Sequence, residues 1–376
     1  MKIKDLGTII KGRTPPTGAQ EYWNGDVPFV TTKDLQSGRY VRSTERSLSH
    51  KGLQLYPKNI LPQNTVCVSC TGNLGYVGIT TKPCMTNQQI LAILPDKNND
   101  PEYIYYLMKS MWSYFKQIEG HSTVTSQISK ERFSDIEINI PKLSVQHEIA
   151  ATLSAFDELL DVNSRKADNL TEQIKLIYEH CVSGSCETIT LDELCTIKYG
   201  TYQIEQSDDS NVAGGIKWLC TQDITGTFVT DTSRYITKEA LSDSKGKQEL
   251  IPAGTIVISI VGTIGRTAIT TEPMCINAAI AYVTPKNSKI KEFIYTYLLN
   301  QYEYLNKIAT GSVLKRININ TLKALPVPVL SDEQYESIID IIHPYFLNLR
   351  QIHDENIVIT QTRDIAIKKL FENTLL

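Results

Sequence analysis

The sequence has little of what secreted or membrane-spanning proteins require. None of its apolar runs approaches the length needed to span a bilayer, and Lys11 and Gly12 interrupt the first apolar stretch too early for a signal peptide. Eight cysteines in 376 residues do not indicate a disulfide scaffold. These features predict a cytoplasmic protein.

Recognisable catalytic machinery is also missing. The sequence contains neither a phosphate-binding G-x-x-x-x-G-K-[ST] loop nor the Asn/Asp-Pro-Pro-aromatic stretch that amino-methyltransferases use. Pro95-Asp96 begins like a nuclease metal motif, but no Glu-x-Lys follows at a workable distance. The six histidines are scattered and form no H-E-x-x-H pattern. We therefore expect a chain without catalytic residues and without a metal site.

The chain consists instead of two copies of one unit. TGNLGYVGITTKP at residues 71–83 returns as VGTIGRTAITTEP at 261–273, and VPFVTTKDL at 27–35 returns as IKWLCTQDI at 216–224. The offset stays between 188 and 190 along the whole chain. Two copies are too few for a solenoid, so we predict a pair of domains related by a pseudo-two-fold axis.

Each copy has a mixed part followed by a long helix. Short β-branched runs such as TVCVS and TIVISI predict strands, and one aromatic-rich helical stretch is expected at residues 101–118 and again at 291–308. The predicted fold class is α+β, with two mixed α/β domains joined by two long antiparallel helices. The expected domains span residues 1–143 and 183–329, and the expected helices span residues 144–182 and 330–376.

Apolar residues spaced alternately by four and three predict a heptad seam on both helices. An isolated apolar stripe needs a partner, so we expect the two helices to pack as an antiparallel coiled coil; the alternative is that each packs on its own domain. Asn163 either fixes the register of the seam or occupies a solvated edge, and Pro344 is expected to kink the second helix or to mark its start. The seam positions are Ile149, Leu153, Phe156, Leu160, Asn163, Ala167, Leu170, Ile174, Ile177, Ile338, Ile342, Tyr345, Leu349, Ile352 and Ile359.

Cys67 and Cys70 form a C-x-x-C pattern of the kind that metal and redox sites use. The repeat places Val257 and Ile260 at the same positions, and residues three apart on a strand face opposite sides. No second C-x-x-C completes a zinc set. We expect both cysteines, like Cys84 and its counterpart Cys275, to be core residues.

Charge is divided among these segments. Residues 1–143 contain 17 Lys and Arg against 12 Asp and Glu, and residues 181–330 contain 14 of each. The helical segments are acidic, with 3 against 7 in residues 144–180 and 4 against 8 in residues 331–376. Acidic helices repel DNA phosphates, so we expect their outer faces to contact protein.

The two copies keep their loop glycines and change the polar residues beside them. Asn73 and Tyr76 stand where the second copy has Thr263 and Arg266. Two domains that recognise different DNA sequences would need one scaffold with different polar side chains. The side chain selects the base, because Arg pairs with guanine, Asn with adenine, and Thr contacts the thymine methyl group. A simple strand turn with glycines at positive φ is the structural alternative, and a G-x-x-G clamp on a nucleic-acid backbone is another.

Three further pairs of polar loops differ between the copies in the same way, although each also fits an ordinary solvated loop. The candidate DNA-contacting residues on all these loops are Lys11, Arg13, Thr14, Thr32, Lys33, Asn73, Tyr76, His121, Ser122, Thr123, Thr201, Tyr202, Gln222, Thr263, Arg266, Ser312, Lys315 and Arg316.

Several stretches carry a family resemblance. They are a G-x-T-P opening with EYWNGDVPFVTTKDL, its degenerate second copy GIKWLCTQDI, and the lead-ins IPKLSVQHEIA and VPVLSDEQYESII to the long helices. In this order, duplicated and each followed by a helix, they resemble the specificity subunit of type I restriction-modification enzymes over essentially the full length.

The resemblance implies two target-recognition domains, each reading one half of a bipartite, asymmetric site in double-stranded DNA. It implies that the helices set the gap between the half-sites and dock two copies of the methyltransferase subunit. S-adenosylmethionine, Mg and ATP would belong to partner subunits, with no cofactor bound by this chain. A motor-nuclease subunit joins in systems that also cleave, and a methylation-only system is the alternative.

Two functions of other classes compete with this one. A protein-interaction scaffold without DNA affinity leaves the unlike polar loops unexplained. A stand-alone nuclease needs the carboxylate–lysine set that the sequence lacks.

Overall fold

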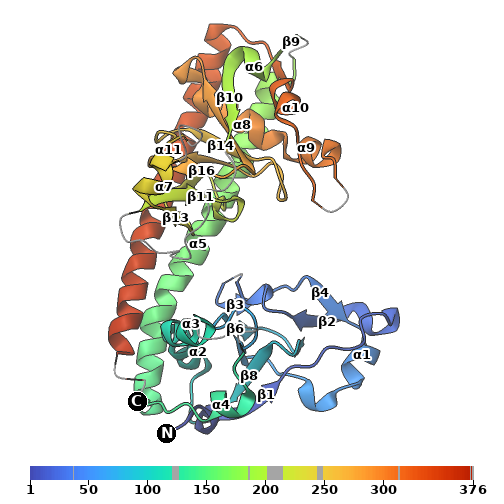
Figure 1. The fold of residues 1–376 in the computed structure, drawn as a ribbon, viewed down its shortest axis with the longest axis vertical. Coiled ribbons are helices and arrows are strands. Elements are labelled where there is room, and N and C mark those ends of the chain that lie inside the picture. The colour runs from blue at the N-terminus through green and yellow to red at the C-terminus, as the bar shows by residue number, and fades with distance from the viewer. Residues whose placement is uncertain are drawn as a thin grey trace. The chain divides into compact units, whose positions relative to one another are not determined.

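The computed structural model describes residues 1–36, 38–120, 127–184, 187–200, 215–243, 249–311, 314–372 and residue 374. The chain divides into two compact units, which are coloured along the chain in Figure 1. The first unit contains residues 1–162 and 357–376, and the second contains residues 163–356. Each unit therefore combines a globular part with a segment of both long helices.

The first unit is built on a five-stranded sheet in the order β1-β8-β5-β6-β3, in which β3 runs parallel to β6 and the other neighbours are antiparallel. The unit also contains a three-stranded sheet in the order β4-β2-β7, whose strands are interspersed along the chain with those of the larger sheet. The strands are β1 (Gly7–Lys11), β2 (Trp23–Val30), β3 (Tyr40–Val41), β4 (Arg46–Leu48), β5 (Val66–Ser69), β6 (Val77–Thr80), β7 (Met85–Thr86) and β8 (Ile90–Pro95). The helices of this part are α1 (His50–Gln54), α2 (Pro101–Ser110), α3 (Trp112–Gly120) and α4 (Lys130–Ser134), with short 3-10 turns at Ile3–Leu6, Gln20–Tyr22, Asp34–Gln36 and Pro57–Asn59.

The second unit repeats this topology. Its five-stranded sheet has the order β10-β17-β14-β15-β12, again with one parallel pair at the β12 edge, and its three-stranded sheet is β13-β11-β16. The strands are β9 (Thr188–Thr190), β10 (Cys195–Tyr199), β11 (Ile216–Leu219), β12 (Phe228–Val229), β13 (Tyr235–Ile236), β14 (Ile256–Ser259), β15 (Thr267–Thr270), β16 (Cys275–Ile276), β17 (Ile280–Pro285) and β18 (Pro326–Pro328). The helices are α6 (Leu191–Leu194), α7 (Lys238–Asp243), α8 (Lys291–Asn300), α9 (Tyr302–Ile308) and α10 (Ile319–Lys323), with 3-10 turns at Thr221–Asp223 and Ser288–Ile290. The sequence repeat is thus a repeat of fold.

The central strands are buried on both faces, which explains their continuous β-branched runs. On β5, Val66 and Val68 belong to the larger core beneath α2, whereas Cys67 faces the opposite core. Cys70 follows in the larger core, so the two cysteines of the C-x-x-C pattern lie on opposite faces. Their prediction as core residues is confirmed, as it is for Cys84 and Cys275.

The aromatic-rich stretches are helical, as predicted, and each consists of two helices. The helical conformation is interrupted at Met111, between α2 and α3, and at Gln301, between α8 and α9. Met111 leaves helical geometry with ψ near 7° and is 1% exposed. Beyond this interruption, Phe115 of α3 stacks against Phe133, and both rings are buried in the core.

The long helices are α5 (Leu143–Val182) and α11 (Asp332–Leu370). Each predicted seam position on them is buried or half-buried. The alternative that Pro344 marks the start of the second helix is wrong, since α11 begins at Asp332 and continues through the proline. Proline lacks one N–H donor, and apolar burial of Ile342 and Phe346 on either side holds the helix together there.

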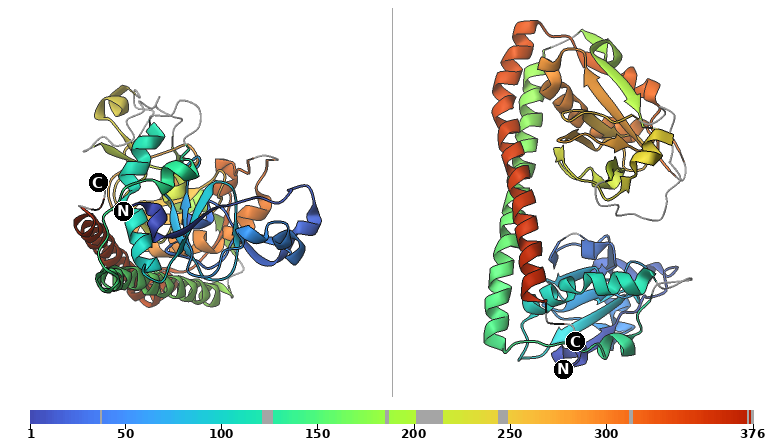
Figure 2. Two further views of the ribbon diagram at one scale, coloured as in Figure 1. Left: turned by 90° about the horizontal axis from the view of Figure 1, so that it is seen from below. Right: turned by 60° about the vertical axis from the view of Figure 1, so that its left-hand side comes forward.

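Within the first unit, α5 lies beside α11 and both pack on the globular part (Figure 2). Ala150 and Leu153 of α5 share a core with Ile367 and Phe371 at the end of α11, beneath the aromatic face of α2. Beyond them, Asp157 accepts a hydrogen bond from Arg363 at 2.6 Å. The helices here meet each other and their own globular part at once.

The second unit has the same double arrangement. Ile174 and Tyr178 of α5 join Ile338 and Ile342 of α11 in one core with the sheet and α8. Asn163 Nδ2 donates to Asn356 Oδ1 at 2.8 Å, which places the polar seam residue opposite a second polar residue. Within each unit the segments of α5 and α11 therefore contact each other as well as the globular part, and the antiparallel coiled coil stays a prediction. The described helices include none long and apolar enough to cross a membrane.

Candidate nucleic-acid interface

The glycine loops join two central strands in each unit, β5 to β6 and β14 to β15. All four glycines have positive φ: 77° and 87° at Gly72 and Gly75, and 77° and 84° at Gly262 and Gly265. An L-residue rarely adopts this conformation, so the expectation of a strand turn with positive φ is confirmed. The two loops have the same backbone shape although the side chains on them differ.

A buried serine holds each loop in this shape. In the first unit, Ser69 Oγ donates to the Asn73 carbonyl at 2.7 Å and accepts the Tyr76 N–H at 2.8 Å. In the second, Ser259 makes the same two bonds to the Thr263 carbonyl and the Arg266 N–H. One hydroxyl thus fixes the backbone of both candidate readers in each loop.

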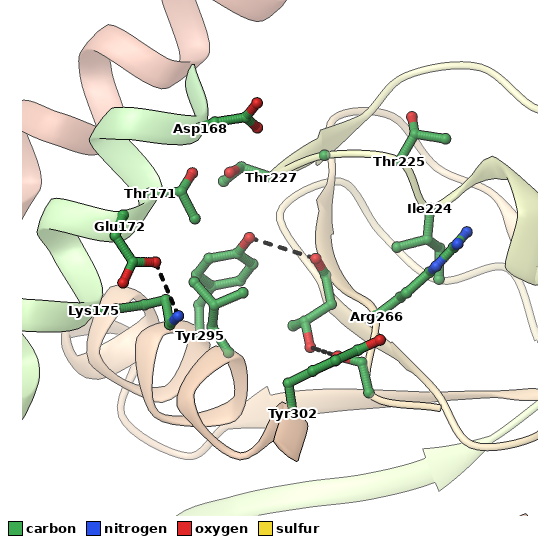
Figure 3. A pocket seen from close by; sticks show the side chains of 14 residues that line it. Asp168, Thr171, Glu172, Lys175, Ile224, Thr225, Thr227, Arg266, Tyr295 and Tyr302 are labelled. Atoms are coloured by element: carbon green, nitrogen blue, oxygen red, sulfur yellow. Dashed lines mark hydrogen bonds and ion pairs between the residues drawn. The ribbon is translucent and has the colours of Figure 1, made fainter. Parts of the chain in front are cut away.

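The residues at positions 76 and 266 each line a hollow within their own unit. Tyr76 packs its ring 5.4 Å from that of Trp112, at the edge of a hollow of about 980 Å³. Arg266 is exposed beside a hollow of about 620 Å³ that Tyr302 and the α5 residue Asp168 also line (Figure 3). The matched positions therefore present a half-buried tyrosine in one unit and an exposed arginine in the other.

A second polar loop runs beside the glycine loop. Its backbone is tied there by the Gly262 N–H, which donates to the Lys315 carbonyl at 2.9 Å, and by the Ile317 N–H, which donates to the Ile260 carbonyl at 2.8 Å. Lys315 and Arg316 are exposed. They therefore lie on the same surface as Thr263, which is also exposed.

The first unit is tied in the same way, since the Ile128 N–H donates to the Cys70 carbonyl at 2.9 Å. The candidate residues of its second loop, His121, Ser122 and Thr123, lie outside the described residues. The same is true of three candidates in the second unit, Thr201, Tyr202 and Ser312.

The first polar loop begins where β1 ends. Gly12 approaches the neighbouring backbone so closely that a Cβ atom would come within 2.0 Å of the Asn87 carbonyl oxygen, and Gly200 has the same role in the second unit. Past it, Arg13 is exposed with its guanidinium 5.4 Å from the Tyr56 ring, and Thr14 hydrogen-bonds to Gln88. Lys11 itself is half-buried.

A further turn presents Thr32 and Lys33, or Gln222 in the second unit. Asp34 holds this turn from within, because its Oδ2 accepts the Thr31 N–H and the Thr31 hydroxyl, both at 2.7 Å. Asp223 accepts the Cys220 N–H at 2.8 Å at the matched position. Lys33 and Gln222 are exposed, whereas Thr32 is half-buried.

Sequence reasoning missed the residues that hold the loops. Ser69, Ser259, Asp34 and Asp223 each accept a hydrogen bond from a backbone N–H group, and nothing in their local sequence marks them for this role. The available signal was their identity between the two copies at positions next to loops that otherwise change.

The described part of the chain contains no group of three or more His, Cys, Asp or Glu residues that could hold a metal ion. Burial raises the pKa of the Cys84 thiol to about 12 and that of Cys67 well above its usual range. Both thiols therefore stay protonated, which does not favour metal ligation or nucleophilic chemistry.

Comparison with known proteins identifies the family. The model of the type I restriction modification DNA specificity domain matches residues 1–172 and again residues 184–361. The specificity subunit of type I restriction enzyme MjaIX from Methanocaldococcus jannaschii is 36% identical over 179 residues, which cover 46% of this chain and 41% of that protein. The chain thus spans about two fifths of that relative's length.

Two other proteins match over most of the chain. The MjaVIII specificity subunit from the same organism is 23% identical over 371 residues, covering 90% of this chain and 83% of that protein. The crystal structure of the type I restriction-modification S subunit from M. genitalium aligns over 99% of this chain and 95% of that chain, with 19% identity and a TM-score of 0.49. With the family model matching both copies of the repeat, the chain belongs to the type I restriction-modification DNA specificity family.

Proposed function

We propose that the chain is the non-catalytic specificity subunit of a type I restriction-modification complex and that its two globular parts read the two halves of a bipartite, asymmetric DNA site. The observation that carries this proposal is a duplicated scaffold with unlike polar residues at matched loop positions. Asn73 and Tyr76 against Thr263 and Arg266 offer different hydrogen-bonding groups on one backbone shape. Identical scaffolds give two half-sites, and unlike readers make the site asymmetric.

In this proposal the two units are related by a pseudo-two-fold axis, and α5 and α11 form the antiparallel coiled coil that sets the gap between half-sites. Supporting it are two polar pairs, each within one unit: Asp157 with Arg363, and Asn163 with Asn356. Polar residues in an apolar seam favour one register over its neighbours.

The same helices would dock two copies of the methyltransferase subunit. Both helical segments are acidic, which disfavours DNA phosphates. Both also expose large apolar side chains that a protein partner would cover. These are Leu159, Val162 and Leu176 on α5, and Ile341, Leu347, Val358 and Ile365 on α11.

The partner subunits would supply the chemistry of this cytoplasmic complex, which acts on adenine N6 with S-adenosylmethionine. Mg and ATP would serve a motor-nuclease subunit where the system cleaves. The present chain would hold none of these groups.

Methylome sequencing tests the specificity role directly. The native host is compared with a strain that lacks this chain alone while its methyltransferase genes remain expressed. We expect N6-methyladenine to disappear from one split, asymmetric motif in the deletion strain. An unchanged methylome would refute the proposal and favour the interaction scaffold.

A gap test addresses the helices. Adding one base pair between the half-sites moves one of them by about 3.4 Å and rotates it by roughly 35°. We expect the assembled complex to lose affinity for such a duplex. Equal binding to duplexes with the natural and the lengthened gap would contradict the proposal that the helices set the distance between the half-sites.

A further inference from the structure

Beside the turn that presents Lys33, one aspartate links two loops. Asp34 is 8% exposed, and while its Oδ2 holds Thr31, its Oδ1 accepts the Glu45 N–H at 3.1 Å. The carboxylate therefore fixes the backbone of Glu45 at a set place opposite the turn. A charge-assisted bond from a nearly buried carboxylate makes this a rigid link.

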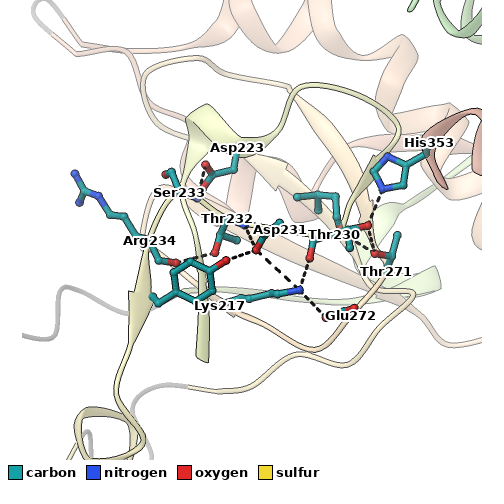
Figure 4. Close-up of polar contacts among 12 residues, drawn as sticks. Lys217, Asp223, Thr230, Asp231, Thr232, Ser233, Arg234, Thr271, Glu272 and His353 are labelled. Carbon is teal, nitrogen blue, oxygen red and sulfur yellow. Dashed lines mark hydrogen bonds and ion pairs between the residues drawn. The ribbon is translucent and has the colours of Figure 1, made fainter. Parts of the chain in front are cut away.

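The second unit repeats the link. Asp223 Oδ2 accepts the Cys220 N–H, and its Oδ1 accepts the Ser233 N–H at 3.0 Å (Figure 4). Ser233 thus stands where Glu45 stands in the first unit. The two units share this backbone arrangement, although the side chains beside it differ: Lys33 and Glu45 in the first unit, and Gln222 and Ser233 in the second.

In both units the side chain of the turn pairs with the side chain that faces it. Lys33 Nζ lies 2.6 Å from Glu45 Oε2, with 77% and 62% of the two side chains exposed. Gln222 Nε2 donates to Ser233 Oγ at 2.7 Å. An ion pair in one unit is thus replaced by a neutral hydrogen bond in the other.

We infer that Glu45 and Ser233 are specificity-determining residues, each controlling what its partner, Lys33 or Gln222, can bind on DNA. This inference rests on the proposed reading of DNA by these turns. An unpaired lysine binds any phosphate, whatever the sequence. While Lys33 is paired with Glu45, its contact with DNA is favourable only where a base also donates a hydrogen bond to the Glu45 carboxylate, as the amino group of cytosine does.

Ser233 acts on Gln222 without a change of charge. It takes one amide N–H and so sets the direction of the remaining N–H and of the carbonyl oxygen. A glutamine needs both groups aligned to contact adenine in the major groove. Fixing the amide beforehand removes the orientations that would accept other bases.

The first experiment maps N6-methyladenine in cells that express the full chain with its methyltransferase partner. Three variants are compared with the natural chain: Glu45→Gln, Ser233→Ala, and the control Glu21→Gln. The control removes the same charge from another exposed ion pair of the first unit, Glu21 with Lys51 at 2.9 Å. Neither test substitution touches the backbone N–H that the aspartate holds.

We expect Glu45→Gln to add methylated sites that deviate from the natural motif in one half only. Ser233→Ala should add sites that deviate only in the other half. Glu21→Gln should leave the motif unchanged. A change in folding or partner assembly would lower methylation at all sites, and it would not relax one half alone.

The second experiment measures how salt weakens binding of the assembled complex to a duplex of unrelated sequence. Release of Lys33 for one added phosphate contact should steepen the slope of log K against log [salt] by about 0.9 in Glu45→Gln. Ser233→Ala should keep the natural slope because it frees no charge. Adding Lys33→Met to Glu45→Gln should restore the natural slope.

The outcomes separate the two proposals. Natural methylation at a split motif, with unchanged motif and slope in Glu45→Gln, overturns the inference and leaves the proposed function standing. Relaxation of the same half by both variants, or an equal slope change in Glu21→Gln, also overturns it. Absence of a split motif in the natural chain overturns the proposed function itself.

Discussion

The ion pair between Asp157 and Arg363 should make a large contribution to the stability of the first unit. The two side chains are only 11% and 12% exposed, and Arg363 Nη1 lies 2.6 Å from Asp157 Oδ1. Asp157 also accepts the Tyr106 hydroxyl at 2.6 Å, which ties α5 to α2. Replacing Arg363 by methionine keeps much of the apolar stem but leaves the buried carboxylate without its cation.

Removing one partner of a buried pair costs about 3–5 kcal/mol, because the remaining charge loses its compensation. For a unit of this size each 1 kcal/mol lowers Tm by roughly 2–4 °C. We therefore expect Arg363→Met to lower Tm by about 6–20 °C. Thermal unfolding followed by circular dichroism measures this, and hydrogen exchange of α2 amides assigns the change to the first unit.

Arg42→Met is the matched control. Arg42 pairs at 2.9 Å with Asp161, which lies on α5 like Asp157, but the side chains of Arg42 and Asp161 are 64% and 43% exposed. An exposed pair contributes about 0–1 kcal/mol, because water already solvates both charges. Equal destabilisation by Arg42→Met and Arg363→Met would refute the argument from burial.

Three further predictions concern the second unit and the first glycine loop. Burial lowers the pKa of His353 below its usual 6.5, so the unfolded chain takes up a proton first as pH falls. The contribution of His353 to the free energy of unfolding should therefore be constant above about pH 6.5 and decrease below it. His353→Gln should remove that decrease, which urea titrations at pH 7 and pH 5 measure. Asn163→Leu should cost about 1–3 kcal/mol because it leaves the Asn356 amide without its partner, whereas the double change with Asn356→Leu should be near neutral, and additive effects in urea denaturation would argue against a direct bond. Gly75→Ala should weaken DNA binding by the assembled complex more than Gly72→Ala, since a Cβ at Gly75 meets the Phe115 ring at 3.0 Å, whereas a Cβ at Gly72 makes only an ordinary contact with Gln89 Nε2 at 3.9 Å; equal losses in a binding titration would contradict this.

Much of the loop surface could be predicted because the repeat separates scaffold from variation. Gly72 and Gly75 recur in the second copy, and the structure gives them the positive φ that only glycine adopts readily. The residues between them change, which marked Asn73 as a candidate contact. The serine and aspartate that hold the loops were not predicted, since a buried hydroxyl bonded to backbone looks like any strand-end serine in sequence.

The breaks in the aromatic helices show why local pattern was insufficient. Residues 101–118 contain no glycine, and their one proline is the first residue, so nothing in the local sequence marks an interruption at Met111. The ring that Phe115 stacks against belongs to Phe133, which lies outside that stretch. A proline, by contrast, did not end α11, because apolar contacts from the rest of the unit outweigh one missing hydrogen bond.

By itself the sequence determined the duplicated α+β plan, the long amphipathic helices and the loops on which polar residues vary. Each of these depends on local periodicity or on comparison of the two copies, which the chain carries internally. Only the tertiary structure decided that α11 completes the first unit, where Phe371 packs near Tyr103 and the Asn139 N–H donates to the Thr374 carbonyl. That decision joins residues more than two hundred positions apart, and the physical reason is burial of an apolar face that the local sequence leaves exposed.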